Sequence, residues 1–220
     1  MNVDRKNYEK WWSENLFSGK TEYEHLGIKI RMPSIEEFSE SWMGSIFDKD
    51  RVKVRKYFKK FNNILDVGCG GSPEFYGINK FKNIEYTGLD ITPEIVDFNI
   101  KKGINCVLGS ANNIPFGDST FDVVHARHLI EHMEDFKKPL DEMIRVAKHL
   151  VLISFFIEPL KSGKSIINLD NKDTEFEIHH NQYSQIDINN YLQLNKKVKK
   201  YKFIKLDGLS KKLLKIKLNS

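Results

Sequence analysis

Residues 64–72 read ILDVGCGGS, an apolar run that ends in an acid and leads into three glycines within four positions. Such a run is typical of a buried strand, and the glycines permit a sharp turn directly after it. Gly68 and Gly70 would leave space for a ligand beside the backbone. Asp66 could accept hydrogen bonds from a ligand ammonium group or an ordered water. The alternative is an ordinary glycine turn between a strand and a helix.

The stretches that follow alternate between strand and helix patterns. We expect strands at 64–67, 86–89, 105–108, 121–125 and 150–155, and helices at 93–102 and 135–147. Short apolar strands separated by helices predict a parallel α/β sheet. In open parallel sheets, ligands bind beyond the carboxyl ends of the strands near the switch point, which is where residues 66–72 fall.

The N-terminal residues 1–61 are expected to be helical. The first run places Tyr8, Trp11, Trp12 and Phe17 on one aromatic face. A tryptophan there could cover a cofactor or a substrate ring, although such residues more often belong to a core. Ser34 and Glu37 have the spacing of a capping box at the start of a second helix, and residues 51–61 form a third amphipathic run.

The C-terminal part begins with a polar stretch, 158–178, that we expect to be a loop or an insertion. A helix over 183–194 and two strands, at about 199–206 and 212–218, are expected to follow. Residues 196–220 contain ten lysines and one acid, whereas the whole chain has a net charge of +5. The alternation in KLLKIKL suits a half-buried edge strand with a charged solvent face. The alternative is a phosphate-binding face, which would need exposed lysines on one side.

Composition narrows the class of protein. The chain has 220 residues, 40% hydrophobic and 30% charged, which suits one domain or a domain with a cap. No stretch approaches the roughly 18 apolar residues of a membrane helix, and the N-terminus has no apolar signal core, so we expect neither a membrane span nor secretion. Cys69 and Cys106 form no CxxC pair, and a reduced, cytoplasmic setting is expected.

A second acid ends the next predicted strand. The sequence YTGLD places Asp90 there, and a carboxylate can hold both hydroxyls of a ribose. We expect Thr92 to cap the following helix, which would leave Asp90 free for a ligand. Pro73 occupies the third glycine position of a dinucleotide-binding GxGxxG motif, and no GK[ST] follows. The sequence therefore argues against NAD, FAD and a P-loop.

Four segments in order resemble the class I S-adenosylmethionine-dependent methyltransferases. They are ILDVGCGGS, YTGLD, GSANNIPFGDSTFDVVHARHLIEHMED and LVLISFF, and they span residues 60–155. The chain is most similar to the small-molecule group related to the ubiquinone and menaquinone biosynthesis methyltransferases. The resemblance implies an α/β, Rossmann-like sandwich with a mostly parallel seven-stranded sheet flanked by helices. It also implies an N-terminal helical cap (1–61) and a methyltransferase core (62–220), with 156–183 as a substrate-side insertion.

The resemblance also implies a cofactor site for S-adenosylmethionine, whose product is S-adenosylhomocysteine. The turn residues and His125, just past the fourth strand, would surround the methionine part. Asp90 would hold the ribose, and Ile91 and the residues at 110–111 would border the adenine. The implied cofactor-binding residues are Asp66, Gly68, Cys69, Gly70, Asp90, Ile91, Ser110, Ala111 and His125. The family usually has an acid at the position of Ser110, and a serine hydroxyl is a weaker, neutral partner.

Two histidine clusters are candidates for the proton acceptor. His128, Glu131 and His132 would share one face of a helix, where they could bind a metal or act as a base. Some related O-methyltransferases have acids at the matching positions, so His128 argues against magnesium and we expect no metal. The alternative is that Glu131 and His132 are structural.

The second cluster lies in EIHHNQYS and contains His179, His180 and Tyr183. In related folds the region after the fifth strand faces the substrate. A histidine, with a pKa of about 6.5, can accept a proton at neutral pH. The alternative is a surface loop with a helix cap at Ser184.

These patterns favour a methyltransferase that acts on a small molecule or a glycan precursor, such as a sugar or sugar nucleotide, at oxygen. The catalytic candidates are His128, His132, His179, His180 and Tyr183. The first alternative is an RNA or protein methyltransferase that uses the basic C-terminal segment, although no RNA-binding module is visible and a nucleic-acid partner is not expected. The second is a binding module that holds the cofactor without catalysis. The sequence leaves the oligomeric state open.

Overall fold

The computed structural model describes residues 22–25, 28–31, 34–78, 84–133, 135–167, 169–170 and 178–219. The aromatic run with Trp11 and Trp12 lies outside the described residues. No helix in the described ranges is long and apolar enough to cross a membrane.

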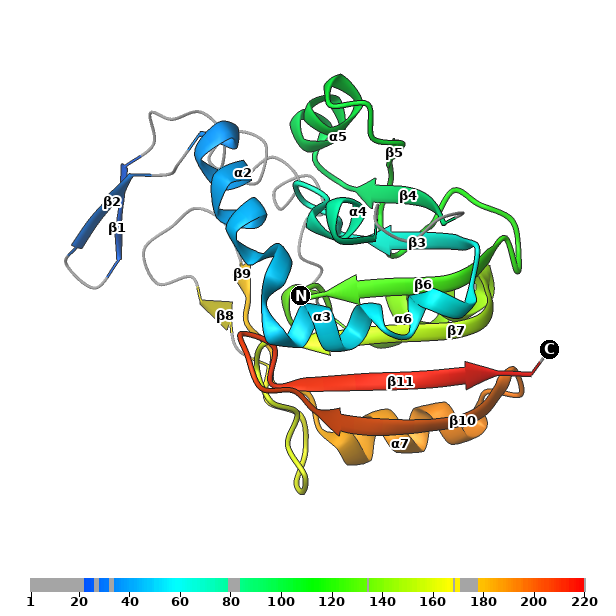
Figure 1. Cartoon of the computed structure of the whole chain (residues 1–220). Coiled ribbons are helices and arrows are strands. Elements are labelled where there is room, and N and C mark those ends of the chain that lie inside the picture. The colour runs from blue at the N-terminus through cyan, green and yellow to red at the C-terminus, as the bar shows by residue number, and fades with distance from the viewer. Residues whose placement is uncertain are drawn as a thin grey trace.

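A seven-stranded sheet forms the centre of the molecule (Figure 1). Its strand order is β10-β11-β7-β6-β3-β4-β5. The strands are β3 (Asn63–Val67), β4 (Glu85–Asp90), β5 (Cys106–Leu108), β6 (Phe121–Arg127), β7 (Ala147–Phe155), β10 (Val198–Lys205) and β11 (Lys212–Leu218). Strands β3 to β7 run parallel, and β11 is antiparallel to both of its neighbours. The predicted mostly parallel seven-stranded sheet is confirmed.

Helices cover both faces of this sheet. The α-helices are α2 (Ile35–Gly44), α3 (Lys49–Arg55), α4 (Pro73–Ile78), α5 (Pro93–Lys101), α6 (Lys137–Val146) and α7 (Gln185–Leu194). The short 3-10 helices are η1 (Ser45–Phe47), η2 (Phe58–Lys60) and η3 (Ile130–His132). Side chains of α6 and α7 pack on one face, and those of α3, η2 and α4 pack on the other.

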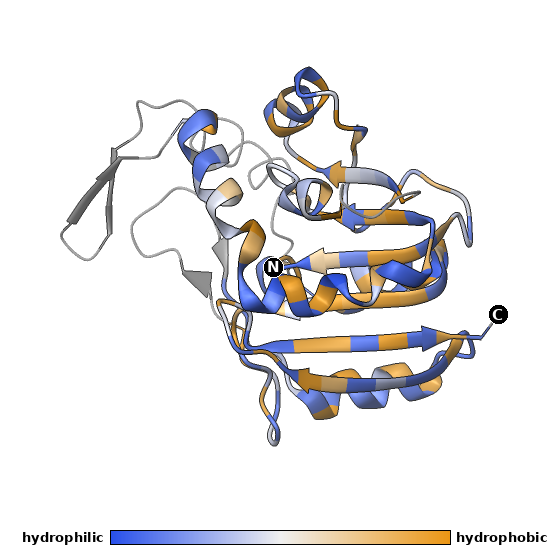
Figure 2. Cartoon of the chain, viewed as in Figure 1, coloured by the Kyte–Doolittle hydropathy of each residue, from blue (hydrophilic) through white to orange (hydrophobic). Residues whose placement is uncertain are grey.

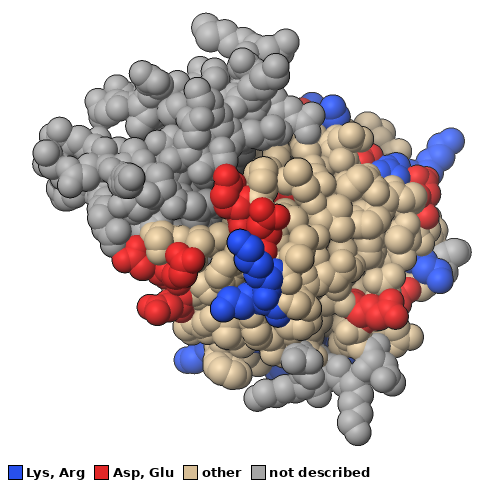
Figure 3. Space-filling model, turned by 90° about the horizontal axis from the view of Figure 1, so that it is seen from above, with Lys and Arg blue, Asp and Glu red and all other residues tan. Residues whose placement is uncertain are grey.

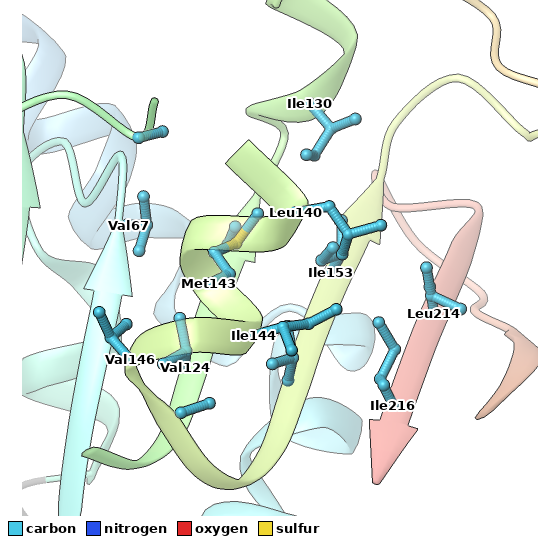
Figure 4. Close-up of a cluster of buried hydrophobic side chains, with 14 of the residues drawn as sticks. Val67, Val124, Ile130, Leu140, Met143, Ile144, Val146, Ile153, Leu214 and Ile216 are labelled. Carbon is cyan, nitrogen blue, oxygen red and sulfur yellow. The ribbon is translucent and has the colours of Figure 1, made fainter. Parts of the chain in front are cut away.

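The core follows from the alternation of side chains along the strands. Val67 and Val124 point into the cluster beneath α6 and α7, which also contains Met143 of α6 and Ile216 of β11 (Figure 4). Residues that alternate with these along the strands, such as Val123 next to Val124, belong to the cluster on the opposite face of the sheet. Figure 2 shows these central strands as the most hydrophobic part of the chain. The sheet is therefore buried on both faces and can hold a turn rigidly at its edge.

Two predicted helix caps are confirmed. The backbone N–H of Ser34 donates to Glu37 Oε2 at 2.7 Å, and the N–H of Glu37 donates to Ser34 Oγ at 3.3 Å, which is a capping box at the start of α2. At the start of α7, Ser184 Oγ accepts a hydrogen bond from the N–H of Ile186 at 3.1 Å.

Two expectations about the chain ends are wrong. Residues 1–61 are not helical throughout, because β1 (Glu22–His25) and β2 (Ile28–Arg31) form an antiparallel pair. The alternation of apolar and basic residues in IKIR has the period of a strand. In addition, β11 is not an edge strand, because it lies between β10 and β7. The polar stretch contains a short strand pair, β8 (Leu169–Asp170) and β9 (Ile178–His179).

Candidate active site

The turn after β3 has the left-handed backbone that its glycines permit. Gly68 and Gly70 have φ angles of 68° and 53°. The N–H groups of Gly68 and Cys69 both donate to the carbonyl of Leu89, which ties the turn to β4. A Cβ at Gly68 would lie 3.0 Å from a methyl carbon of Leu129, just after β6. The turn therefore lies at the carboxyl ends of β3, β4 and β6, at the switch point of the sheet.

Asp90 ends β4 and faces this turn. Its Oδ2 accepts a hydrogen bond from the N–H of Gly70 at 3.0 Å, and its Oδ1 accepts one from the N–H of Thr92 at 3.1 Å. Thr92 makes no side-chain cap for α5, and its N–H donates to Asp90 instead, so the expectation that Thr92 would cap this helix in place of Asp90 is wrong. Burial raises the pKa of Asp90. Ribose hydroxyls would share this carboxylate with its protein donors.

The side chain of Asp66 is buried against residues of the two neighbouring strands. Its Oδ1 lies 2.8 Å from Nδ1 of His125, and its Oδ2 accepts a hydrogen bond from the hydroxyl of Tyr86 at 2.9 Å. Both carboxylate oxygens thus already have protein donors, and the residue is only 4% exposed. His125 was expected just past the fourth strand, which is wrong, because β6 continues to Arg127. Its ring is buried beside Asp66, a contact that no local pattern predicts.

The thiol of Cys69 also points away from the surface of the turn. It lies 3.6 Å from the thiol of Cys106 on β5, and both cysteines are free. The space for the two sulfurs comes from Gly88, where a Cβ would lie 2.8 Å from Cys69 Sγ. The neighbouring thiol and burial raise the pKa of Cys69. Cys69 can therefore offer a ligand its backbone rather than its sulfur.

The predicted adenine side of the site lies after β4 and β5. The N–H of Gly109 donates to the carbonyl of Asp90 at 2.9 Å, which brings the loop that starts there to the end of β4. Ser110 and Ala111 are buried, and Ile91 is half-buried. Ser110 Oγ accepts a hydrogen bond from the N–H of Asn112 at 3.1 Å, so the serine also shapes its own loop.

His128 is fixed against the protein. It has a φ of 55°, and its Nε2 lies 2.9 Å from Oγ of Ser210, in the loop between β10 and β11. Burial, together with the guanidinium groups of Arg127 and Arg51, lowers the pKa of His128 to about 3. The ring is therefore neutral near pH 7 and is a weak proton acceptor. This favours a structural role for His128 over a catalytic one.

The structure brings His132 and His180 together around Phe156. The ring of His132 stacks on Phe156, with centroids 5.2 Å apart and planes at 27°. The His180 ring lies 5.1 Å from His132 and 6.2 Å from Phe156. Both histidines are half-buried. His179 lies in β9, where its backbone pairs with Leu169.

Glu131 and Tyr183 make internal hydrogen bonds. Residues 130–132 form a 3-10 turn, so the predicted α-helical face of His128, Glu131 and His132 does not exist. Glu131 accepts hydrogen bonds from the N–H groups of Phe156 and Ile157, and its burial raises its pKa to about 7. The Tyr183 hydroxyl donates to the carbonyl of Met133 at 2.8 Å. These contacts favour structural parts for both residues.

Comparison with known proteins identifies the family. A methyltransferase domain model matches residues 65–155. The uncharacterized protein MJ0638 of Methanocaldococcus jannaschii is 31% identical over 187 residues, which cover 80% of this chain and 68% of that protein. The chain belongs to the class I S-adenosylmethionine-dependent methyltransferases. S-adenosylmethionine is the cofactor of this family, and the narrower likeness to the ubiquinone group stays a prediction.

Other similar proteins share the methyltransferase domain. Ajmaline N-methyltransferase of Rauvolfia serpentina is 35% identical over 97 residues, which cover 40% of this chain and 33% of that enzyme. The chain thus matches about a third of that relative's length. The crystal structure of PH0226 from Pyrococcus horikoshii superposes with a TM-score of 0.59 at 18% identity, covering 78% of this chain and 88% of that one. That likeness concerns the fold.

The residues at the turn fit the cofactor of this family. The two left-handed glycines leave their part of the turn without side chains, and Asp90 places a carboxylate beside it at the end of β4. Within the described ranges, no three His, Cys, Asp or Glu side chains are grouped so that they could hold a metal ion.

Sequence reasoning missed three contributors to the site: Tyr86, Phe156 and Ser210. Phe156 follows the last residue of β7, and an aromatic residue at a carboxyl strand end could have been noticed. Tyr86 reads as an ordinary strand residue. Ser210 belongs to a loop that no motif marks.

Proposed function

We propose that this chain transfers a methyl group from S-adenosylmethionine to an oxygen of a small molecule or glycan precursor, such as a sugar or sugar nucleotide. The observation that carries the proposal is the pair of imidazoles, His132 and His180, around Phe156. A hydroxyl loses its proton when it is methylated, and an imidazole can accept that proton at neutral pH. His132 follows β6 along the chain, and the same segment approaches the glycine turn through Leu129.

The contacts of these residues suggest the role of each in the reaction. The cofactor, when bound, supplies an electrophilic methyl group on a positively charged sulfur. Asp90 and the turn would hold the nucleoside, while Phe156 would keep water from the acceptor and His132 or His180 would take its proton. His128, whose ring meets Phe156 edge-on with centroids 5.3 Å apart, would support Phe156 rather than exchange protons.

A labelled methyl donor tests the acceptor class. The chain would be incubated with isotopically labelled S-adenosylmethionine and separate panels of sugars, sugar nucleotides, small amines, RNA and protein. We expect label on the hydroxyl-bearing small molecules. Label only on amines would overturn the assignment to oxygen. Ajmaline N-methyltransferase, to which the chain is similar, is named for methylation at nitrogen. No label on any panel would favour a binding module without catalysis.

We also propose the domain division 1–61 and 62–220, with residues 156–183 on the substrate side. Its support is the placement of His180 and Phe156 beside each other, which brings the two ends of the insertion to one place. At the other boundary, α3 joins the core through ion pairs from Arg51 to Glu74 and from Asp50 to Arg127. The cap would therefore be fixed to the core rather than free.

One surface favours RNA as a second candidate acceptor. In the register of β10 and β11, Lys202 lies opposite Lys215, and Lys200 lies opposite Lys217. Like charges directly opposite each other destabilise a sheet. Burial and the neighbouring lysines lower the pKa of Lys215, whose ammonium group lies 3.8 Å from the centre of the Tyr57 ring. We name Lys200, Lys202, Lys215 and Lys217 the lysine face.

No acid offsets this charge within the part of the chain that the structure describes, where the lysine face forms no ion pair. By contrast, the face shown in Figure 3 carries acidic and basic side chains in small separate groups. A flat array of lysines fits a chain of phosphates, which would relieve the repulsion between them.

Replacing Lys200 and Lys217 with glutamine tests the lysine face. Removing two phosphate contacts would weaken binding to a labelled single-stranded RNA and reduce the slope of log K against log salt by about 1.4. Fluorescence anisotropy between about 50 and 200 mM salt measures both. The matched control is Lys101→Gln with Lys138→Gln, two exposed helical lysines elsewhere. RNA binding that is absent at low salt, or equally weakened by the control, would remove this candidate.

A further inference from the structure

Three polar side chains from neighbouring strands form a buried hydrogen-bonded group below the glycine turn. We name Asp66 of β3, Tyr86 of β4 and His125 of β6 the polar trio. Their exposed fractions are 4%, 7% and 1%. Because an ionised carboxylate only accepts hydrogen bonds, the imidazole Nδ1 carries the proton that points at Asp66. None of the three is placed to face a ligand directly, although Asp66 comes only two residues before Gly68.

Aromatic rings close the trio from the side of the cluster beneath α3 and α4. Phe58 meets the His125 ring edge-on, with centroids 5.5 Å apart, and Phe75 meets the Tyr86 ring in the same way at 5.6 Å. Phe75 belongs to α4, the helix that follows the turn. The polar trio thus connects β3, the strand that precedes the turn, with α4, the helix that follows it.

Ser72 links the trio to the end of the turn. It is fully buried and has a φ of 54°, which is an uncommon conformation for a residue with a side chain. Its carbonyl accepts a hydrogen bond from the N–H of Phe75 at 3.0 Å, and the Phe75 ring packs on Tyr86. A change at Tyr86 therefore acts directly on Asp66 before the glycines and, through Phe75, on the residues after them.

We propose that Tyr86 and His125 are positioning residues for cofactor binding, which hold the Asp66 carboxylate oriented behind the turn without touching the cofactor. The Tyr86 hydroxyl and the His125 imidazole each hold one carboxylate oxygen, at 2.9 Å and 2.8 Å, two residues before Gly68. S-adenosylmethionine is a cation at its sulfur, so a fixed negative charge behind the turn stabilises it more than the product.

Tyr86→Phe tests the proposal with the loss of one hydroxyl. Asp66 loses the hydrogen bond from the Tyr86 hydroxyl, so we expect the Kd for S-adenosylmethionine to rise about tenfold. The KM for the cofactor should rise while kcat at saturation stays unchanged, because the trio acts on binding rather than on the methyl acceptor. Titration calorimetry and steady-state kinetics measure these values. The matched control is Tyr201→Phe, since that hydroxyl donates to a backbone carbonyl in another part of the sheet.

Asp66→Asn separates a charge effect from a structural one. The amide keeps the size of the side chain but loses the charge, so the affinity for S-adenosylmethionine should fall at least threefold more than that for S-adenosylhomocysteine. An equal fall for both ligands would overturn the electrostatic part. A Tyr86→Phe variant with a lower Tm and an unchanged Kd would overturn the positioning part. Should that variant fail to fold, the ligand ratio of Asp66→Asn decides the proposal alone.

Discussion

Replacement of Asp90 with alanine is expected to weaken the binding of S-adenosylhomocysteine by on the order of 2 kcal/mol or more, which is about thirtyfold in Kd. The ribose hydroxyls would lose a charged acceptor. The N–H groups of Gly70 and Thr92 would lose their partner as well, so the turn itself would be less well held. Calorimetric titration of the wild type and the variant measures the difference.

Two further variants define what Asp90 does. Asp90→Asn keeps one carbonyl oxygen for a backbone N–H and removes the charge, so it should fall between the wild type and the alanine variant. Asp97→Ala removes an exposed carboxylate from α5 and should leave the Kd unchanged. An Asp90→Ala variant that binds as well as the wild type would contradict the assignment of the ribose to this carboxylate.

Loss of the proton acceptor is expected to give the largest effect on turnover. Glutamine at whichever of His132 and His180 acts as the base should lower kcat about 100-fold or more, with little change in the KM for the cofactor. Single-turnover rates with a hydroxyl acceptor measure the effect.

His149→Gln is the matched control for the histidines. This residue lies near the start of β7, where its ring stacks on Phe61. It should leave kcat unchanged. If the single and double replacements of His132 and His180 all kept the wild-type rate, neither histidine would be the proton acceptor. Alignment of the acceptor with the methyl donor would then be enough for transfer.

The local patterns of the sequence were sufficient for much of the fold. The run before Gly68, the period of the strands and the capping residues Ser34 and Ser184 act between residues close in the chain, so their effects could be predicted from spacing. The same holds for Asp90, because the carboxyl end of one parallel strand lies beside that of the next.

Local spacing did not predict the arrangement of the histidines. A spacing of three and four residues predicts a shared face only in an α-helix, and residues 130–132 form a 3-10 turn instead. The low pKa of His128 depends on burial and on Arg51 of α3, 77 residues away in the chain. No local pattern carries that information.

The sequence by itself determined the α/β class, the turn at Gly68 and Gly70, and the acid that ends β4, because glycine conformation and side-chain periodicity are local properties of the chain. The tertiary structure alone decided that Asp66 faces Tyr86 and His125, that His132 meets His180 around Phe156, and that β11 lies inside the sheet. These contacts join residues far apart in sequence, and burial, packing and charge between distant segments select them.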